Sequence, residues 1–165
     1  MKILWLSHIV PFPPKAGVLQ RCYNMLNESA KYHDIDLLTF VQKEIFLQIY
    51  EDPAQGLNEA ESFLKSICGN VCFVPIESEN SFLGSYWLAI RSLFTKNPYT
   101  INWLKSKIYL QRLRCLINDN NYDLIYFDTI SLMLYLDEIG AKPSILDHHN
   151  IESHLLLRRG PVGEI

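Results

Sequence analysis

Short apolar segments alternate along the chain with longer segments in which apolar residues recur every three or four positions. The first pattern is typical of strands buried on both faces of a parallel sheet, and the second is typical of amphipathic helices. Strands are predicted at residues 3–6, 35–40, 71–76, 124–127 and 144–147. Helices are predicted at residues 18–32, 42–50, 57–68, 81–95, 103–118 and 132–138, with another from about residue 151.

The spacing of apolar residues also predicts which side of each helix is buried. In the first helix this side carries Val18, Cys22, Met25, Leu26 and Ala30. In the helix at 103–118 it carries Leu104, Ile108, Leu113, Leu116 and Ile117. Proline cannot continue a helix, so Asp52–Pro53 is expected to break the helical region at 42–50.

Strands that alternate with helices predict right-handed βαβ units and a parallel sheet. The expected fold is α/β: a Rossmann-like, doubly wound parallel sheet of order 3-2-1-4-5 with helices on both faces. We expect one such domain over residues 1–165.

Polar residues follow the strands that would lie side by side at the centre of this sheet. Ser7 and His8 follow the first strand, Asp128 follows the fourth, and residues 147–150 follow the fifth. Ligands of open α/β sheets bind outside the carboxyl ends of the strands. The candidate site is therefore expected where these three ends converge, around the stretch 144–159.

Composition and charge narrow the class of protein. The chain is 48% hydrophobic and 20% charged, as is usual for globular domains, and its net charge of −3 does not favour nucleic-acid binding. No run of apolar residues is long enough to cross a bilayer, and the apolar start ends too early for a signal peptide. Four cysteines without a Cys-x-x-Cys pair lie on apolar elements, which favours buried, reduced thiols in a cytoplasmic protein.

Several common chemistries lack their motifs. There is no Gly-x-Gly-x-x-Gly after the first strand, no P-loop and no Gly-x-Ser-x-Gly elbow. The spacing of His149 and His154 does not suit two metal ligands on one helix face, and no cysteine lies nearby, so no metal site is predicted. Asp147 and Glu152 lie on one short segment and are not expected to flank a sugar from opposite sides.

Seven segments, in this order, resemble a known family. They are residues 1–7, 11–17 (Pro-Phe-Pro-Pro-Lys-Ala-Gly), 21–24 (Arg-Cys-Tyr-Asn), 33–40, 97–100 (Asn-Pro-Tyr-Thr), 122–126 and 146–153. Together they are similar to the amino-terminal domain of family-four retaining glycosyltransferases, which have the GT-B fold. The likeness covers nearly the whole chain.

The resemblance implies a two-domain enzyme that moves a sugar from a nucleotide-sugar to a saccharide or lipid-linked acceptor with retention. The amino-terminal domain would hold the acceptor, and the carboxyl-terminal Rossmann-like domain would hold the donor. No metal or resident cofactor is implied. Relatives continue beyond the position of Ile165, so we expect a dissected or truncated domain that is inactive without its partner domain.

The resemblance also assigns roles to single residues. His149 matches the catalytic histidine that lies beside the transferred sugar, and Asn150 stands where relatives often have aspartate. Gly17 matches a loop glycine that approaches the donor phosphates, although Ala16 and Val18 replace neighbouring glycines. A structural role for the His149 imidazole is the alternative.

Three further residues are predicted to bind substrate. Arg21 matches the basic residue of the first helix, where it would face an anionic group. His8 follows the first strand directly, and Asp128 is expected either to bind an acceptor hydroxyl or to serve as a loop or cap residue.

Two interpretations stay open at this level. The aromatic and basic residues of 81–114 favour a helix pair with one buried side, but they also allow peripheral contact with the inner face of a membrane or with the absent domain. As a whole, the chain is either half of an enzyme or a non-catalytic Rossmann-like binding or interaction module.

Overall fold

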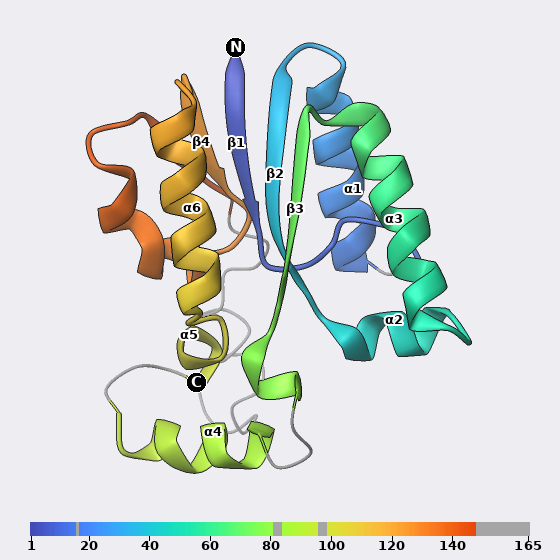
Figure 1. Ribbon diagram of the computed structural model, residues 1–165, viewed down its shortest axis with the longest axis vertical. Coiled ribbons are helices and arrows are strands. Elements are labelled where there is room, and N and C mark those ends of the chain that lie inside the picture. Colours follow the sequence, from blue (N-terminus) through green and yellow to red (C-terminus); the bar gives the residue numbers. More distant parts are fainter. Residues whose placement is uncertain (16, 81–83, 96–98, 148–165) are drawn as a thin grey trace, which may run out of the picture.

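The computed structural model describes residues 1–15, 17–80, 84–95 and 99–147. Its core is a five-stranded parallel sheet of order β3-β2-β1-β4-β5 (Figure 1). The strands are β1 (Lys2–Ser7), β2 (Asp34–Val41), β3 (Asn70–Pro75), β4 (Leu124–Phe127) and β5 (Ser144–Leu146). The predicted α/β, Rossmann-like sheet is confirmed.

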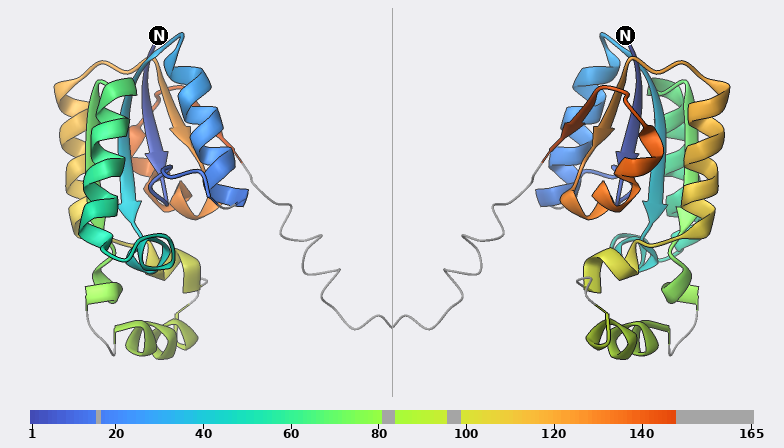
Figure 2. Two further views of the ribbon diagram at one scale, coloured as in Figure 1. Left: turned by 90° about the vertical axis from the view of Figure 1, so that its right-hand side faces the viewer. Right: turned by 90° about the vertical axis from the view of Figure 1, so that its left-hand side faces the viewer.

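Helices cover both faces of the sheet (Figures 1 and 2). The α-helices are α1 (Gly17–Ala30), α2 (Lys43–Ile49), α3 (Pro53–Ile67), α4 (Gly84–Leu93), α5 (Tyr99–Trp103) and α6 (Lys107–Asp119). Two 3-10 helices complete the described elements, η1 (Glu77–Asn80) and η2 (Ile130–Ile139).

Alternation along each central strand divides the core into two layers. In β1, Ile3 and Trp5 pack with residues of α1 and α3, whereas Leu4 and Leu6 pack with residues of α6 and η2. Successive side chains of a strand point to opposite faces, so an uninterrupted apolar run supplies both layers. Each such fully buried side chain contributes roughly 1.5–3 kcal/mol relative to exposure.

The predicted break of the helical region at Asp52–Pro53 is confirmed, because α2 ends at Ile49 and these residues begin α3, ahead of its predicted start at residue 57. A carboxylate oxygen of Asp52 accepts a hydrogen bond from the Ala54 amide at 2.9 Å. Pro53 is the first helical residue, where the missing N–H has no intrahelical partner to lose. The dipeptide therefore caps a helix.

The helix predicted at 103–118 is present as α6, which begins four residues later, and the predicted Leu104, Leu113 and Leu116 are buried. Ser106 begins α6, with its hydroxyl accepting from the Tyr109 amide at 3.3 Å. Tyr109 is fully buried on the same side as Leu113 and Leu116, whereas the predicted Ile108 is 45% exposed. Tyr109 stacks on Phe40 of the sheet at a centroid distance of 4.2 Å.

The buried side of α1 agrees with the prediction in part. Cys22 and Leu26 are buried as predicted, whereas Val18 and Met25 are exposed and Leu19 is buried in their place. Val18, Met25 and Leu19 all have helical spacing to the confirmed pair, so the pattern alone did not decide among them. The choice was made by the side that meets Ile9 and the sheet.

The fifth strand is exposed, although its sequence predicted burial. All three residues of β5 are exposed. It is the edge strand of the described sheet and pairs there with β4 alone.

Cys115 is exposed, against the prediction of a buried thiol, because it lies between the buried Leu113 and Leu116 on the outer side of α6. Cys22 and Cys68 are buried.

The helix α4 lies beyond the carboxyl ends of the strands and not on a face of the sheet (Figures 1 and 2). Leu88 is half-buried, but Tyr86, Ile90 and Leu93 are exposed. The predicted buried side is therefore present only in part, since no strand surface lies beneath the helix. Contact with a membrane or with another domain remains a prediction for this helix.

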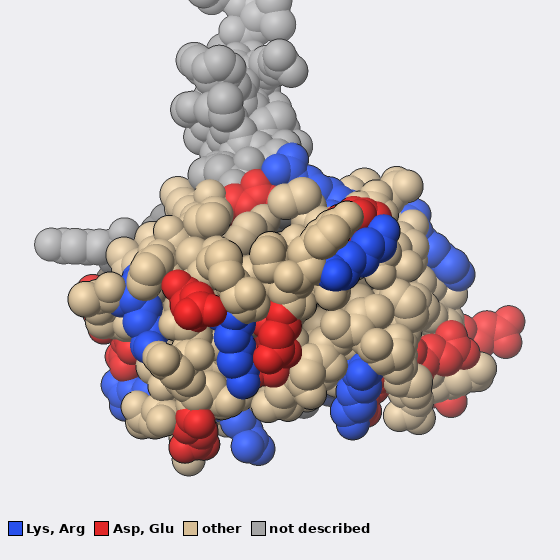
Figure 3. All heavy atoms as spheres, turned by 90° about the horizontal axis from the view of Figure 1, so that it is seen from above, with Lys and Arg blue, Asp and Glu red and all other residues tan. Residues whose placement is uncertain are grey.

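Within the described ranges, no helix combines the length and the apolar character needed to cross a bilayer. Seen from the amino ends of the strands, acidic and basic side chains are interspersed, and neither sign forms a large patch on this face (Figure 3).

Candidate functional site

Asp128 and the pair Ser7–His8 meet at the carboxyl edge of the sheet. Strands β1 and β4 are parallel neighbours, with Leu6 opposite Phe127, so the residues that follow them are adjacent. The Asp128 amide donates to the Leu6 carbonyl at 3.1 Å, which continues the ladder by one residue. The predicted convergence of these two strand ends is confirmed.

The Asp128 carboxylate is buried and hydrogen-bonded. It is 1% exposed. One oxygen accepts from the Ser7 hydroxyl at 2.5 Å, and the other lies 3.1 Å from both the His8 amide and His8 Nδ1. Burying a carboxylate is costly unless such donors replace water, so Ser7 and His8 maintain Asp128 in this place.

The Ser7 hydroxyl has a choice of acceptors. Its oxygen lies 2.6 Å from the Ile9 carbonyl as well as 2.5 Å from Asp128, and its one hydrogen can serve only one of them at a time. The same oxygen accepts from the Ile9 amide at 3.3 Å. Ser7 thus links the turn after β1 to the carboxylate after β4.

The His8 ring is held by Asp128 at Nδ1. Its Nδ1 contacts Asp128, its carbonyl accepts from the Gln42 amide group at 2.8 Å, and its side chain is 19% exposed. A carboxylate at one ring nitrogen fixes the orientation of an imidazole and favours the tautomer with hydrogen on that nitrogen. The lone pair is then on Nε2, where the ring can accept a hydrogen bond.

Arg21 and Asp147 form a second pair at the same edge. The guanidinium of Arg21 lies 2.7 Å from Asp147, whose other oxygen accepts from the Tyr126 hydroxyl at 2.9 Å. Burial and the bond to Asp147 raise the pKa of Tyr126, so its hydroxyl stays a donor at neutral pH. The anionic group that Arg21 faces in this structure is Asp147.

Cys22 lies behind the site but is not a nucleophile. Its sulfur is 3.9 Å from an Asp128 oxygen. Burial, followed by the negative charge of Asp128, raises the pKa of the Cys22 thiol. Because the thiolate is the reactive form, this thiol is inert at neutral pH.

Gly17 is the first residue of α1, in open surroundings. A Cβ placed on it would meet no atom of another element within 4 Å. The structure therefore leaves room for a ligand to approach its backbone, and no packing requires glycine here.

His149 and Asn150, together with His148 and His154, lie outside the described residues. Their predicted roles stay predictions. Among the residues that are described, no three histidine, cysteine, aspartate or glutamate side chains are grouped so that they could hold a metal ion.

The sequence analysis assigned no role to Ser7 or Tyr126, although both support charged residues of the site. A signal was present: Ser7 comes directly after an apolar run and Tyr126 lies inside one, and a buried hydroxyl needs a partner. A similar lone polar residue, Asp36 in β2, accepts from the Tyr122 hydroxyl at 2.6 Å and lies 3.5 Å from the Lys2 ammonium. That group lies at the amino ends of the strands and is structural.

Comparisons of the chain with protein-family models, with curated proteins and with solved structures found no match.

Proposed function

We propose that this chain is the acceptor-binding, amino-terminal half of a retaining glycosyltransferase, in which a second Rossmann-like domain holds the nucleotide-sugar. The sequence resemblance suggests the family, and the sheet order is in keeping with it. The observation that carries the proposal is the contact of His8 Nδ1 with Asp128 at 3.1 Å, at the edge where such sheets bind ligands.

His8 is assigned to the acceptor. With Nδ1 held by Asp128, Nε2 accepts a hydrogen bond from the acceptor hydroxyl and orients its oxygen toward the donor sugar. Because the two reactants are already oriented in one cleft, much of the entropy cost of their encounter no longer contributes to the reaction barrier. Asp128 is a positioning residue in this scheme, because its burial favours holding His8 over direct contact with an acceptor.

The remaining residues are assigned to the donor side. His149 hydrogen-bonds the transferred sugar, with Asn150 beside it, and favours the geometry in which charge develops on the leaving phosphate. When the donor binds, Arg21 exchanges its contact with Asp147 for a contact with a donor phosphate, or contacts both groups. The open backbone at Gly17 lets this phosphate approach. Closure of the two domains excludes water that would hydrolyse the donor.

The reaction is assigned to the cytoplasm, with a sugar or glycolipid as acceptor. The four free thiols are in keeping with a reducing compartment. A glycolipid acceptor would bring the enzyme to the inner face of a membrane, where exposed apolar residues of α4 are available for contact.

The test uses the full reading frame that encodes this chain, screened with UDP- and GDP-sugars against saccharide and glycolipid acceptors. The informative variant is His8→Asn, because the asparagine amide replaces Nδ1 as the partner of Asp128 but supplies nothing at Nε2. We expect it to fold like the wild type and to slow transfer more than about tenfold. Asp123→Asn, at the exposed opposite end of β4, is the matched control and should leave the rate unchanged.

Two further variants separate the assigned roles. His149→Ala should also slow transfer by more than about tenfold without unfolding the protein. Gly17→Ala should raise the KM for the donor, since its methyl group occupies space that the structure leaves open. Binding of acceptor without transfer of any sugar would favour the non-catalytic module, and wild-type rates in His8→Asn would remove His8 from the site.

A further inference from the structure

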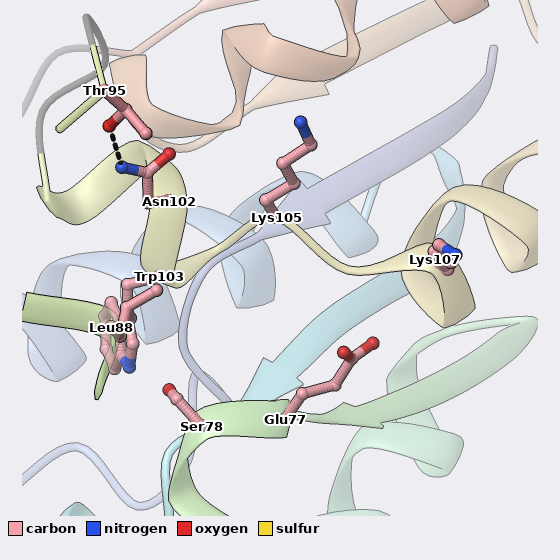
Figure 4. Close-up of a pocket in the computed structure, with 8 residues that line it drawn as sticks. All are labelled: Glu77, Ser78, Leu88, Thr95, Asn102, Trp103, Lys105 and Lys107. Carbon is pink, nitrogen blue, oxygen red and sulfur yellow. Dashed lines mark hydrogen bonds between the residues drawn. The ribbon is translucent and has the colours of Figure 1, made fainter. Parts of the chain in front are cut away.

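A cavity of about 570 Å³ lies past the carboxyl end of β3, separate from the residues around Asp128 (Figure 4). Its walls come from η1, α4, α5 and the loop into α6. Its volume is within the range of small-molecule sites, which are clefts of about 300–1,000 Å³. The chemistry of its lining indicates which ligand it would recognise.

One wall is apolar and partly aromatic. Trp103 and Leu88 both line the cavity, and both are half-buried (Figure 4). Trp103 packs against the core beneath it, which holds the ring in place. A fixed indole offers a flat apolar surface of the kind on which the C–H face of a sugar ring stacks.

The opposite wall carries a hydroxyl that has no partner. Ser78 Oγ is shielded from solvent and makes no hydrogen bond within the described part of the chain. Figure 4 shows it directed toward Trp103 and Leu88. An unpaired buried hydroxyl is unfavourable, and rotation about the Ser78 Cα–Cβ bond would let it pair with a ligand hydroxyl in the cavity. This observation favours a polar ligand over an apolar one.

The charges of the lining favour an anion. Lys105 and Lys107 are exposed, and among the described residues neither takes part in an ion pair. Glu77 is the carboxylate of this cavity, and it accepts from the Ser106 hydroxyl at 3.1 Å. Two cations therefore outnumber one anion.

A smaller hollow, of about 280 Å³, shares Trp103 with the cavity. Its charged lining residues are Glu44 and Glu79. An anionic group would be repelled there, so the charge distribution also fixes the side of Trp103 on which it binds.

We infer that this cavity binds a saccharide that carries an anionic group, a carboxylate or a phosphate. The sugar ring stacks on Trp103, a ring hydroxyl pairs with Ser78, and the anion faces Lys105 and Lys107. These assignments use only groups that the cavity presents, and none of them needs a transfer reaction.

The cavity and the site around His8 lie at the same edge of the sheet. Gln42 donates to the His8 carbonyl at 2.8 Å, and the next residue, Lys43, donates through its amide to Glu79 of η1 at 2.9 Å. The further statement that this cavity is the subsite for an acidic acceptor rests on the proposed function. The inference that the cavity binds an acidic saccharide does not.

The test is an NMR titration of this chain in which the indole N–H resonance of Trp103 is followed. Trp103→Phe identifies that resonance among the three tryptophans. The probes are glucuronic acid, glucose 6-phosphate, neutral glucose and inorganic phosphate. The variants are Lys105→Ala/Lys107→Ala and Ser78→Ala, with Lys31→Ala/Lys65→Ala as a control that removes the same charge from other exposed positions.

We expect at least one acidic sugar to shift the resonance with an affinity about tenfold higher than that of glucose. The lysine variant should lose this preference, Ser78→Ala should weaken both sugars, and the control should bind like the wild type. Preference for the carboxylate or for the phosphate sugar supports the inference and identifies the anion.

Equal affinity for acidic and neutral sugars, or unchanged binding in the lysine variant, would overturn it. Inorganic phosphate that binds as well as the phosphorylated sugar would overturn the saccharide part. Sugar binding that persists in a full-length protein with no transferase activity would refute the proposed function alone.

Discussion

Replacement of Asp128 by alanine is expected to lower the free energy of unfolding by about 4 kcal/mol. The carboxylate accepts from the His8 amide and from His8 Nδ1, both at 3.1 Å. Each buried donor left without an acceptor costs about 1–3 kcal/mol. The Ser7 hydroxyl adds little to this sum, because it can turn to the Ile9 carbonyl at 2.6 Å.

The isosteric replacement Asp128→Asn should cost much less, about 1 kcal/mol. The remaining carbonyl oxygen can accept from both His8 groups, and the new amide can donate to Ser7 Oγ while Ser7 donates to Ile9. The His8 and Ser7 groups then keep their partners, and the loss is confined to the added strength of bonds to a charged acceptor and to the second amide hydrogen. The difference between the two variants measures the unsatisfied donors directly.

Urea unfolding near neutral pH, followed by circular dichroism and by tryptophan fluorescence, is the assay. Domains of this kind have about 5–15 kcal/mol of stability, so even the alanine variant should fold. Asp123→Ala is the matched control: this exposed carboxylate precedes β4 as Asp128 follows it, and it accepts from the Lys2 amide at 2.7 Å. It should cost less than about 1 kcal/mol.

Two results would refute this reasoning. If Asp128→Ala behaves like the control, the carboxylate is not buried among these donors. If the asparagine variant is as unstable as the alanine variant, the Ser7 hydroxyl cannot turn to the Ile9 carbonyl. The hydrogen bonds that we assign to Ser7 in this variant are then wrong.

Two other properties follow from the same structure. At mildly alkaline pH, a thiol reagent should modify Cys115 rapidly and Cys68 only on unfolding, because Cys115 is exposed while burial raises the pKa of Cys68 to about 12; loss of the fast phase in Cys115→Ser checks the assignment. Burial also raises the pKa of Tyr135 from 10.0 to about 12, so that between these values the unfolded chain loses this proton first and stability falls as pH rises. Over that pH range the free energy of unfolding of Tyr135→Phe should fall by roughly 2–3 kcal/mol less than that of the wild type in urea titrations. An equal dependence of this free energy on pH in the two proteins would contradict the burial of the hydroxyl.

The strands and their order were predictable from sequence because they depend on local information. A continuous apolar run such as that in β2 can be satisfied only between two layers, and helices between strands require parallel crossovers. The meeting of Ser7, His8 and Asp128 follows from strand order alone, since the ends of neighbouring parallel strands share an edge.

The tertiary structure decided what the pattern left degenerate. On α1, Val18 and Met25 have helical spacing but are exposed, and on α6 the fully buried position belongs to Tyr109 and not to the neighbouring Ile108. The occupation of both Asp128 oxygens and the unpaired hydroxyl of Ser78 depend on side chains brought together from distant elements, as for His8 and Asp128, 120 residues apart. Apolar spacing indicates which residues are buried, but hydrogen bonds between distant segments form only when the chain folds.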